Sequence, residues 1–440
     1  MERPRTMPAQ VSAQPRRTCM PPETGTPGTA WTWGTVRLVG GPSPWQVWPL
    51  RADSIRTAWQ EAGSDALTLG LGEAWRSGPG GFAELLALLE THPDLVAFGS
   101  PGWPGDARPA GAWVVPEWVW QGDAQGQSGT WQWQGKVLSD ESRPDWTVRA
   151  LASADVLLQT GPRETAADGP RWVRPHALQG KDRFLAGARR VLTQLAGDGL
   201  AKVVLSRDIT LRAEAPVDPW AVFRGMARRA ADSHRMAWQE PGAAAWLAAS
   251  PERLCSWSGA SFVTEALAGT AVRTQGSEAL GDLDRPAAQA EQGVVQTGVR
   301  RALAGLVIDL REDTPSPVAW QGLVHLKATL AGRLAPGTTV ADLVSALNPT
   351  AAVAGWPGQE AQAWIRWLEG RPRGRYAAPF GRLTAREGML AVGIRGVAIR
   401  EQEACVTVGA GLVRGSTPEG EWAETEAKLD AVLRLLGRDA

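Results

Sequence analysis

The sequence predicts an α+β protein in which large antiparallel sheets are flanked by helices. Strand-like and helix-like runs are interspersed along the 440 residues, without the β–α–β rhythm of a doubly wound parallel sheet and without a short internal repeat. Apolar residues make up 43% of the chain and charged residues 21%, as is typical of globular proteins. A chain of this length can bury one large core or two to three smaller ones.

The elements follow in order. Residues 1–29 are rich in Pro, Thr, Arg and Gly without periodicity, which predicts a disordered leader. Short apolar runs at 66–70 and 113–116 and a helix over 82–89 occupy the N-terminal part, residues 30–175, of which 138–175 is polar and irregular. No linker interrupts the remainder, so residues 176–440 are predicted to form one unit. Within it we expect helices at 181–196, 219–231 and 287–306, and strands at 201–207, 244–249, 253–257, 376–384, 389–400 and 403–413.

Composition excludes several classes of function. The formal net charge is +0, so no overall field attracts nucleic acid or an anionic membrane. No apolar run reaches the roughly 18–20 residues that span a bilayer, and no secretory signal begins the chain. Cys19, Cys255 and Cys405 lack paired spacing, and four scattered histidines indicate no zinc site. We therefore expect a cytoplasmic protein without nucleic-acid or membrane partners.

Two residue types are used with an unusual bias. Of the 46 basic residues, only Lys136, Lys181, Lys202, Lys327 and Lys428 are lysine. Lysine can lose its proton where its surroundings favour the neutral form, whereas arginine stays charged, so each lysine is a candidate for proton transfer. The chain also has 23 Trp against 6 Phe and 1 Tyr, and nothing in the sequence explains this excess.

The last forty residues combine a glycine-rich strand end, 408–413, with an acidic helix. Ser416 and Glu419 have the spacing of a capping box, and Pro418 suits the first helical turn. Glu421, Glu424 and Lys428 then share one helix face. Two carboxylates and an ammonium beside free backbone amides can hold a hard cation together with an anionic ligand. A solvated acidic face is the alternative interpretation.

Two further residues are candidates for proton transfer. Lys202 begins an apolar strand and is either a lysine that reaches water from the strand end or a partly desolvated general base. Glu252 follows a strand and a Ser-Pro turn, where it is either exposed or a proton donor facing a cleft.

Glu291 and Arg395 are candidates for binding charged groups. Glu291 lies early in a helix, where an acidic side chain either interacts with the helix dipole or adds to the carboxylates that Mg²⁺ prefers. Arg395 interrupts an apolar strand and needs an anionic partner, which is a substrate carboxylate or a structural aspartate.

Taken together and in order, these segments resemble the chorismate-utilising enzymes, and among them most of all the isochorismate synthases. The resemblance extends over about residues 181–440 and is only loose before that. It is carried by the segments 202–207, 250–254, 264–270, 347–355, 376–381, 409–413 and 421–425.

The resemblance implies the fold of anthranilate synthase component I and a Mg²⁺-dependent addition of water to C2 of chorismate with loss of the 4-hydroxyl group. It implies that Lys202 is the base that activates water and that Glu252 is the acid that protonates the leaving hydroxyl. It assigns the metal to Glu291 and Glu424, with Glu421 at the edge of that site. The implied substrate-binding residues are Gly269, Thr270, Tyr376, Arg395, Gly409, Ala410, Gly411 and Lys428.

Two positions distinguish branches of the family. The ammonia-using relatives usually carry glutamine in place of Lys202, and some carry a lysine nucleophile in place of Ala268. The resemblance therefore implies water chemistry, no glutaminase subunit, and a product used for menaquinone or siderophore synthesis. Salicylate synthases share the lysine and remain an alternative, as does a silent homologue that binds chorismate without turnover. Around Glu291 the usual Lys-Asp-x-x-Glu-His pattern is replaced by residues 287–292, which lack the basic-acidic pair and the histidine.

Overall fold

A computed structural model describes the fold of most of the chain. It describes residues 11–13, 31–39, 43–47, 54–78, 81–104, 106, 111–123, 125, 127–138, 172–173, 180–197, 199–272 and 283–437. Most of the predicted leader, 1–29, and of the irregular segment 138–175 lies outside these residues. No helix among the described residues is long and apolar enough to cross a membrane.

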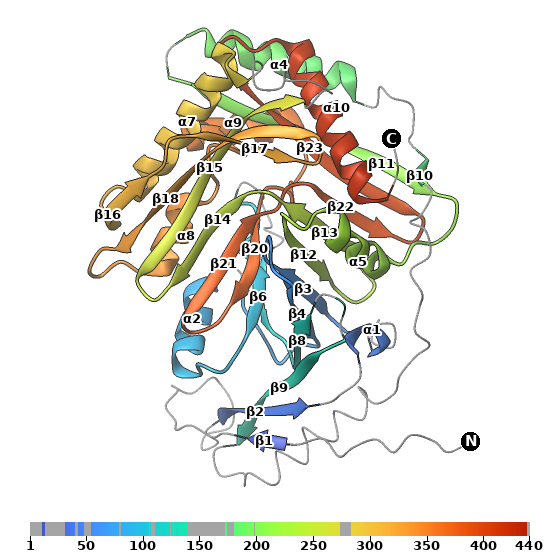
Figure 1. Ribbon diagram of the computed structural model, residues 1–440. Coiled ribbons are helices and arrows are strands. Elements are labelled where there is room, and N and C mark those ends of the chain that lie inside the picture. Colours follow the sequence, from blue (N-terminus) through green and yellow to red (C-terminus); the bar gives the residue numbers. More distant parts are fainter. Residues whose placement is uncertain are drawn as a thin grey trace.

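Two sheets dominate the described part of the chain, and every strand pair in them is antiparallel, which confirms the predicted class (Figure 1). The first sheet contains, in spatial order, β1 (Val11–Ala13), β2 (Trp31–Val39), β9 (Gly129–Leu138), β8 (Trp118–Asp123), β4 (Ala66–Leu71), β3 (Arg56–Gln60), β12 (His234–Gln239), β13 (Ala245–Ser250), β22 (Gly396–Arg400), β23 (Glu403–Val413), β11 (Lys202–Ala213) and β10 (Trp172–Val173), with β19 (Gly355–Trp356) beside β11.

The second sheet is smaller. It contains, in spatial order, β16 (Val307–Glu312), β18 (Leu323–Leu334), β15 (Ser261–Val272), β14 (Arg253–Ser258), β21 (Glu387–Val392), β20 (Pro379–Leu383), β6 (Ala97–Ser100), β7 (Ala112–Val115) and β5 (Trp75–Arg76), with β17 (Ser316–Trp320) beside β18.

Strands from the two ends of the chain interleave in both sheets. In the first sheet β12 pairs with β3, so that Met236 lies opposite Trp59. In the second sheet β20 pairs with β6, so that Arg382 lies opposite Phe98. The N-terminal strands therefore extend the same sheets that carry the C-terminal strands.

The two sheets pack against each other through aromatic side chains. Trp238 and Trp246 of the first sheet contact Phe380 of the second, with ring centroids 5.8 and 5.9 Å apart. Phe98 and Trp59 are buried in the same cluster. These large side chains fill the space between the sheets, which leaves the outer faces to the helices.

Helices cover the outer faces, and α4, α9 and α10 gather at one end of the molecule (top of Figure 1). A larger core cluster joins α2, α4, α7, α8 and α9 to both sheets. The described helices are α1 (Pro44–Val47), α2 (Phe82–Thr91), α4 (Lys181–Leu195), α5 (Pro219–Arg229), α7 (Pro286–Leu303), α8 (Val340–Leu347), α9 (Gly358–Glu369) and α10 (Pro418–Leu435).

Four sequence expectations need correction. The N-cap of α10 is Thr417, whose hydroxyl accepts a hydrogen bond from the Gly420 amide, whereas the Ser416 hydroxyl accepts one from the Val413 amide. The predicted strand 389–400 is two strands, because Arg395 has a left-handed backbone with φ of 54°. Tyr376 lies in a turn before β20, which begins only at Pro379. Within the predicted leader, β1 pairs with β2.

Candidate functional site

Most of the predicted site residues lie around one cavity between the two sheets and α7 and α10. β11 and β23 supply one wall, and β15 and β18 supply another. The cavity is lined by Val204, Glu252, Leu267, Ala268, Thr270, Glu291, His325, Ala352, Val353, Tyr376, Ile394, Arg395, Thr407, Val408, Gly409, Gly411 and Lys428.

A buried ion pair joins the first residue of β11 to α7. Lys202 is fully buried, and its Nζ lies 2.9 Å from Glu291 Oε1. The other oxygen of Glu291 accepts a hydrogen bond of 3.0 Å from the Gly269 amide. A Cβ at Gly411 would lie 2.3 Å from Glu291 Oε1 and 2.7 Å from Lys202 Cε. Glycine is therefore required opposite Val204 in β23 for the ion pair to form.

Glu252 lies in the turn between β13 and β14, and its side chain faces the cavity. Burial raises the pKa of its carboxyl to about 8, and the negative charge of Glu265 acts in the same direction. The charges of Lys202 and Arg395 and a hydrogen bond of 3.5 Å from the Thr350 hydroxyl lower this pKa, but burial prevails. At neutral pH Glu252 is therefore protonated and able to donate a proton.

Carboxylates gather where α10 meets α7. Burial, followed by the charges of Glu424 and Glu291, raises the pKa of Glu421 well above its usual value. Glu421 Oε2 is buried and accepts no hydrogen bond. On the same helix face, Lys428 Nζ lies 2.5 Å from Glu424 Oε1 and donates to the Gly409 carbonyl at 2.8 Å. This confirms the predicted common face of Glu421, Glu424 and Lys428.

This carboxylate set fits a hard divalent cation. The like charges repel one another, and Glu421 Oε2 is buried without a hydrogen bond, although Ser416 forms a hydrogen bond with the same carboxyl group. Among the described residues, no three His, Cys, Asp or Glu side chains already form a metal site. A Mg²⁺ ion bound here would need water and substrate oxygens to complete its shell, since Mg²⁺ commonly takes one or two carboxylates.

The opposite side of the cavity can bind anions. Arg395 is buried, and its Nη2 lies 3.2 Å from His325 Nε2, while His325 Nδ1 lies 3.2 Å from the Thr270 hydroxyl. Because a guanidinium only donates, Nε2 must accept, and the proton of the neutral ring is on Nδ1. Burial, with the charges of Arg395 and Lys428, lowers the pKa of His325 well below its usual value, which agrees with this tautomer.

Tyr376 completes this side of the cavity. Burial raises the pKa of its hydroxyl, which therefore stays protonated. A Cβ at Gly409 would lie 2.6 Å from Tyr376 Oη, so glycine is needed here as well. Arg373 lies under the ring at 5.5 Å and is itself fixed by two hydrogen bonds to Glu369 and by donation to the carbonyls of Val204 and Val353. This buried network ties the Tyr376 turn to β11.

The structure brings nearly all the predicted residues together. Lys202 lies directly behind Glu291, and Glu421 and Glu424 lie beside the cavity on α10. Ala410 does not line the cavity with its side chain, which packs into the hydrophobic core on the other face of β23. His325 was missed, and its only sequence signal is a polar ring within the apolar run Leu323–Leu326.

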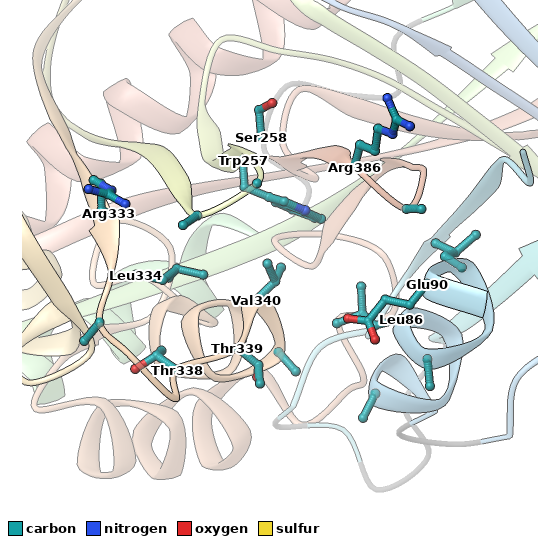
Figure 2. A pocket seen from close by; sticks show the side chains of 18 of the residues that line it. Leu86, Glu90, Trp257, Ser258, Arg333, Leu334, Thr338, Thr339, Val340 and Arg386 are labelled. Atoms are coloured by element: carbon teal, nitrogen blue, oxygen red, sulfur yellow. The ribbon is translucent and has the colours of Figure 1, made fainter. Parts of the chain in front are cut away.

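A larger cavity of about 1060 Å³ lies elsewhere, between α2, α8 and the ends of the second sheet. Figure 2 shows Leu86 and Glu90 projecting from α2 on one side, with Arg333 and Leu334 on the other. Its lining is mostly apolar and hydroxyl-bearing, and none of the predicted site residues contributes to it. The smaller cavity, which holds the buried acid and the ion pair, is therefore the candidate site.

Comparison with known proteins gives a family match over most of the chain. A family model described as "Chorismate binding enzyme" matches residues 106–437. The chain is 30% identical over 248 residues to isochorismate synthase 2, chloroplastic, of Arabidopsis thaliana, which is 55% of this chain and 44% of that protein. It is 35% identical over 243 residues to the salicylate biosynthesis isochorismate synthase of Pseudomonas aeruginosa, which is 53% of this chain and 50% of that protein. The chain spans about half the length of these curated relatives.

Two solved structures share the fold. MenF, the menaquinone-specific isochorismate synthase from Escherichia coli, matches with a TM-score of 0.76 at 23% identity, over 93% of this chain and 95% of that chain. Anthranilate synthase component I from Streptococcus pneumoniae matches with a TM-score of 0.62 at 20% identity, over 95% of each chain. At these identities the likeness establishes the fold, and it confirms the fold that the sequence resemblance implies.

The substitution Gly411→Ala tests the close packing of the ion pair. The added methyl group would displace Lys202 or Glu291, both of which are held by other contacts, so we expect a loss of about 1–3 kcal/mol in the free energy of unfolding. Urea denaturation measures it. The control is Gly358→Ala, where a Cβ meets nothing within 4 Å. Equal stabilities for the two variants would show that the side chains move aside freely.

The raised pKa of Glu252 predicts a pH-dependent stability. The folded carboxyl has a pKa of about 8 and the unfolded one about 4.5, so its contribution is fully present below pH 4.5 and is lost as the pH rises through 8. The Glu252→Gln variant has no carboxyl group at this position and so lacks this pH-dependent contribution to the free energy of unfolding. We expect the stability of the variant relative to the native protein to increase by roughly 3 kcal/mol between pH 5 and pH 8. The free energy of unfolding of both proteins is measured by denaturant titration at several pH values. A difference between the two proteins that stays the same at every pH would contradict the prediction.

Proposed function

This chain belongs to the chorismate-binding enzyme family, and from that premise we propose that it is an isochorismate synthase. The proposal rests on one observation above all: a buried lysine and a buried, protonated glutamate flank one cavity. Lys202 and Glu252 are close enough for the charge of the lysine to lower the pKa of the acid. A base and an acid on either side of a bound ring are what exchange of a hydroxyl for water requires.

The chemistry assigns a role to each residue. Water forms a bond to C2 of chorismate while the bond from C4 to its hydroxyl oxygen breaks and the ring double bonds shift. Lys202 first gives up to solvent the proton that it carries in the ion pair with Glu291, and its neutral amine then accepts a proton from the attacking water. Glu252 donates its proton to the departing hydroxyl, which leaves as water. The proton taken up by Lys202 balances the one given by Glu252, so the reaction is an isomerisation.

Binding of the dianionic substrate is divided between two groups of residues. Arg395 and Tyr376, with Lys428 nearby, face the cavity and suit the enolpyruvyl carboxylate. Glu291 and Glu424 would hold Mg²⁺, with Glu421 beside them, and the metal would neutralise the ring carboxylate. Gly269 and Thr270 of β15 and the backbone of Gly409–Gly411 would line the ring.

Water rather than ammonia is the proposed nucleophile. Lys202 occupies the position where ammonia-using relatives have glutamine, and a small, buried Ala268 lines the cavity where some have lysine. On this basis the enzyme needs no glutaminase subunit. We further propose a place in menaquinone or siderophore synthesis in the cytoplasm. The pathway is supported by the Escherichia coli structure, which is named menaquinone-specific, and by a relative from Vibrio cholerae that is named a vibriobactin-specific isochorismate synthase.

Removal of the base or the acid tests the mechanism. Lys202→Ala and Glu252→Gln should each lower the rate of isochorismate formation by about 10²–10⁴, because each proton transfer contributes that much. Purified protein is incubated with chorismate and Mg²⁺, and the products are separated by chromatography. Isochorismate alone is expected from the native protein. Salicylate with pyruvate would instead identify a salicylate synthase, and binding without turnover a silent homologue.

Removal of the metal tests the carboxylate cluster. A chelator should abolish turnover, and added Mg²⁺ should restore it. Glu424→Gln should raise the Mg²⁺ concentration for half-maximal rate by roughly tenfold or more, because a ligand oxygen is lost. The control is Glu419→Gln on the same helix, since Glu419 is exposed and pairs with Arg189. Turnover that persists in the chelator would remove the metal from the mechanism.

A further inference from the structure

Arg395 is a buried cation without a carboxylate partner. In the part of the chain that the structure describes, no carboxylate forms an ion pair with it, and its Nε is buried without a hydrogen-bond partner. Burial lowers the pKa of Arg395 to about 10 although Tyr376, Glu424 and Glu252 act in the opposite direction, and the group stays charged at neutral pH. Among the described residues, the only side-chain hydrogen bond that Arg395 forms runs from its Nη2 to His325. A buried charge with so few partners needs another source of stabilisation.

Trp320 provides that stabilisation. Arg395 lies over the indole ring, with its guanidinium carbon 5.1 Å from the ring centroid. The ring is only 2% exposed and donates from Nε1 to the Ser233 hydroxyl at 2.5 Å. It ends β17, opposite Leu323 of β18, and Arg434 donates to the carbonyl of the next residue, Gln321, at 2.5 Å. The indole is therefore held from several sides.

Arginine–tryptophan pairs of this kind recur through the chain. They connect the two biases of its composition, the preference for arginine over lysine and the excess of tryptophan. A planar guanidinium stacks on an aromatic face better than an ammonium does, so arginine and tryptophan are favoured together. Some of these arginines also have a carboxylate, as Arg373 has Glu369, whereas Arg395 has none. The stacked pairs are Arg56–Trp220, Arg190–Trp367, Arg207–Trp422, Arg224–Trp45, Arg301–Trp356, Arg373–Trp103, Arg375–Trp238 and Arg395–Trp320.

We propose that Trp320 is a positioning residue for the substrate carboxylate, acting through Arg395. An aromatic face attracts the guanidinium without neutralising its charge, and, unlike a carboxylate, it takes up none of the N–H donors in a charge-assisted hydrogen bond. A carboxylate in that place would compete with the substrate for the same donors. This inference rests on the proposed function, since it takes the ligand of Arg395 to be a carboxylate of chorismate.

Substitution of Trp320 separates positioning from general stability. Trp320→Leu should raise the KM for chorismate by about ten- to thirtyfold with less than a threefold change in kcat, because a desolvated cation–π contact is lost. Trp320→Phe keeps a weaker face and should raise KM by only about two- to fivefold. The matched control is Trp367→Leu, which removes the exposed stack on Arg190 outside the cavity and should leave KM unchanged.

Direct binding keeps the two proposals distinct. Calorimetric titration of chorismate into Glu252→Gln, alone and combined with each Trp320 substitution, measures affinity without turnover, and the same order of affinities is expected. A native protein that binds chorismate but forms no isochorismate would overturn the proposed function and leave this inference standing. Unchanged KM and affinity in Trp320→Leu, or in Trp320→Phe if the leucine variant does not fold, would overturn the inference about Trp320. A fall in the kcat of these variants with an unchanged KM would also overturn it.

Discussion

The ion pair between Lys202 and Glu291 is the contact on which the arrangement of the site depends. It joins the start of β11, near one edge of the first sheet, to a helix that packs on the other sheet, and both Gly411 and the Gly269 amide lie against it. A fully buried ammonium is tolerated only next to such a partner. The same pair therefore sets the distance between β11 and α7, and with it the width of the cavity.

The rest of the cavity balances its charges in three different ways. Glu252 carries no charge at neutral pH, because burial raises the pKa of its carboxyl group by more than the nearby cations Lys202 and Arg395 lower it. The carboxylates of α10 remain close together, with Lys428 among them and an unsatisfied oxygen on Glu421. Arg395 rests on an indole face. An incompletely compensated interior of this kind suits a charged ligand, because binding supplies the partners that the protein withholds.

Sequence reasoning named most of the residues that the structure brings together around the cavity, but it did not predict their geometry. Glu421, Glu424 and Lys428 share a face because helical periodicity is local, and that much was readable directly. Thr417 replaced Ser416 as the helix cap because two adjacent hydroxyl residues precede the same proline, and spacing cannot choose between them. His325 and Trp320 were missed because a single ring in an apolar strand is usually core. The partners of β3 and β6 were beyond reach, since pairing between distant strands leaves no local pattern.

The interleaving of early and late strands has a consequence for biosynthesis. β3 leaves the ribosome long before β12, and β6 waits for nearly the whole chain before β20 can pair with it. Until then these strands expose unpaired backbone edges and the tryptophans that later fill the space between the sheets. Shortening the chain at its carboxyl end would therefore leave the N-terminal strands without the partners that complete their sheets.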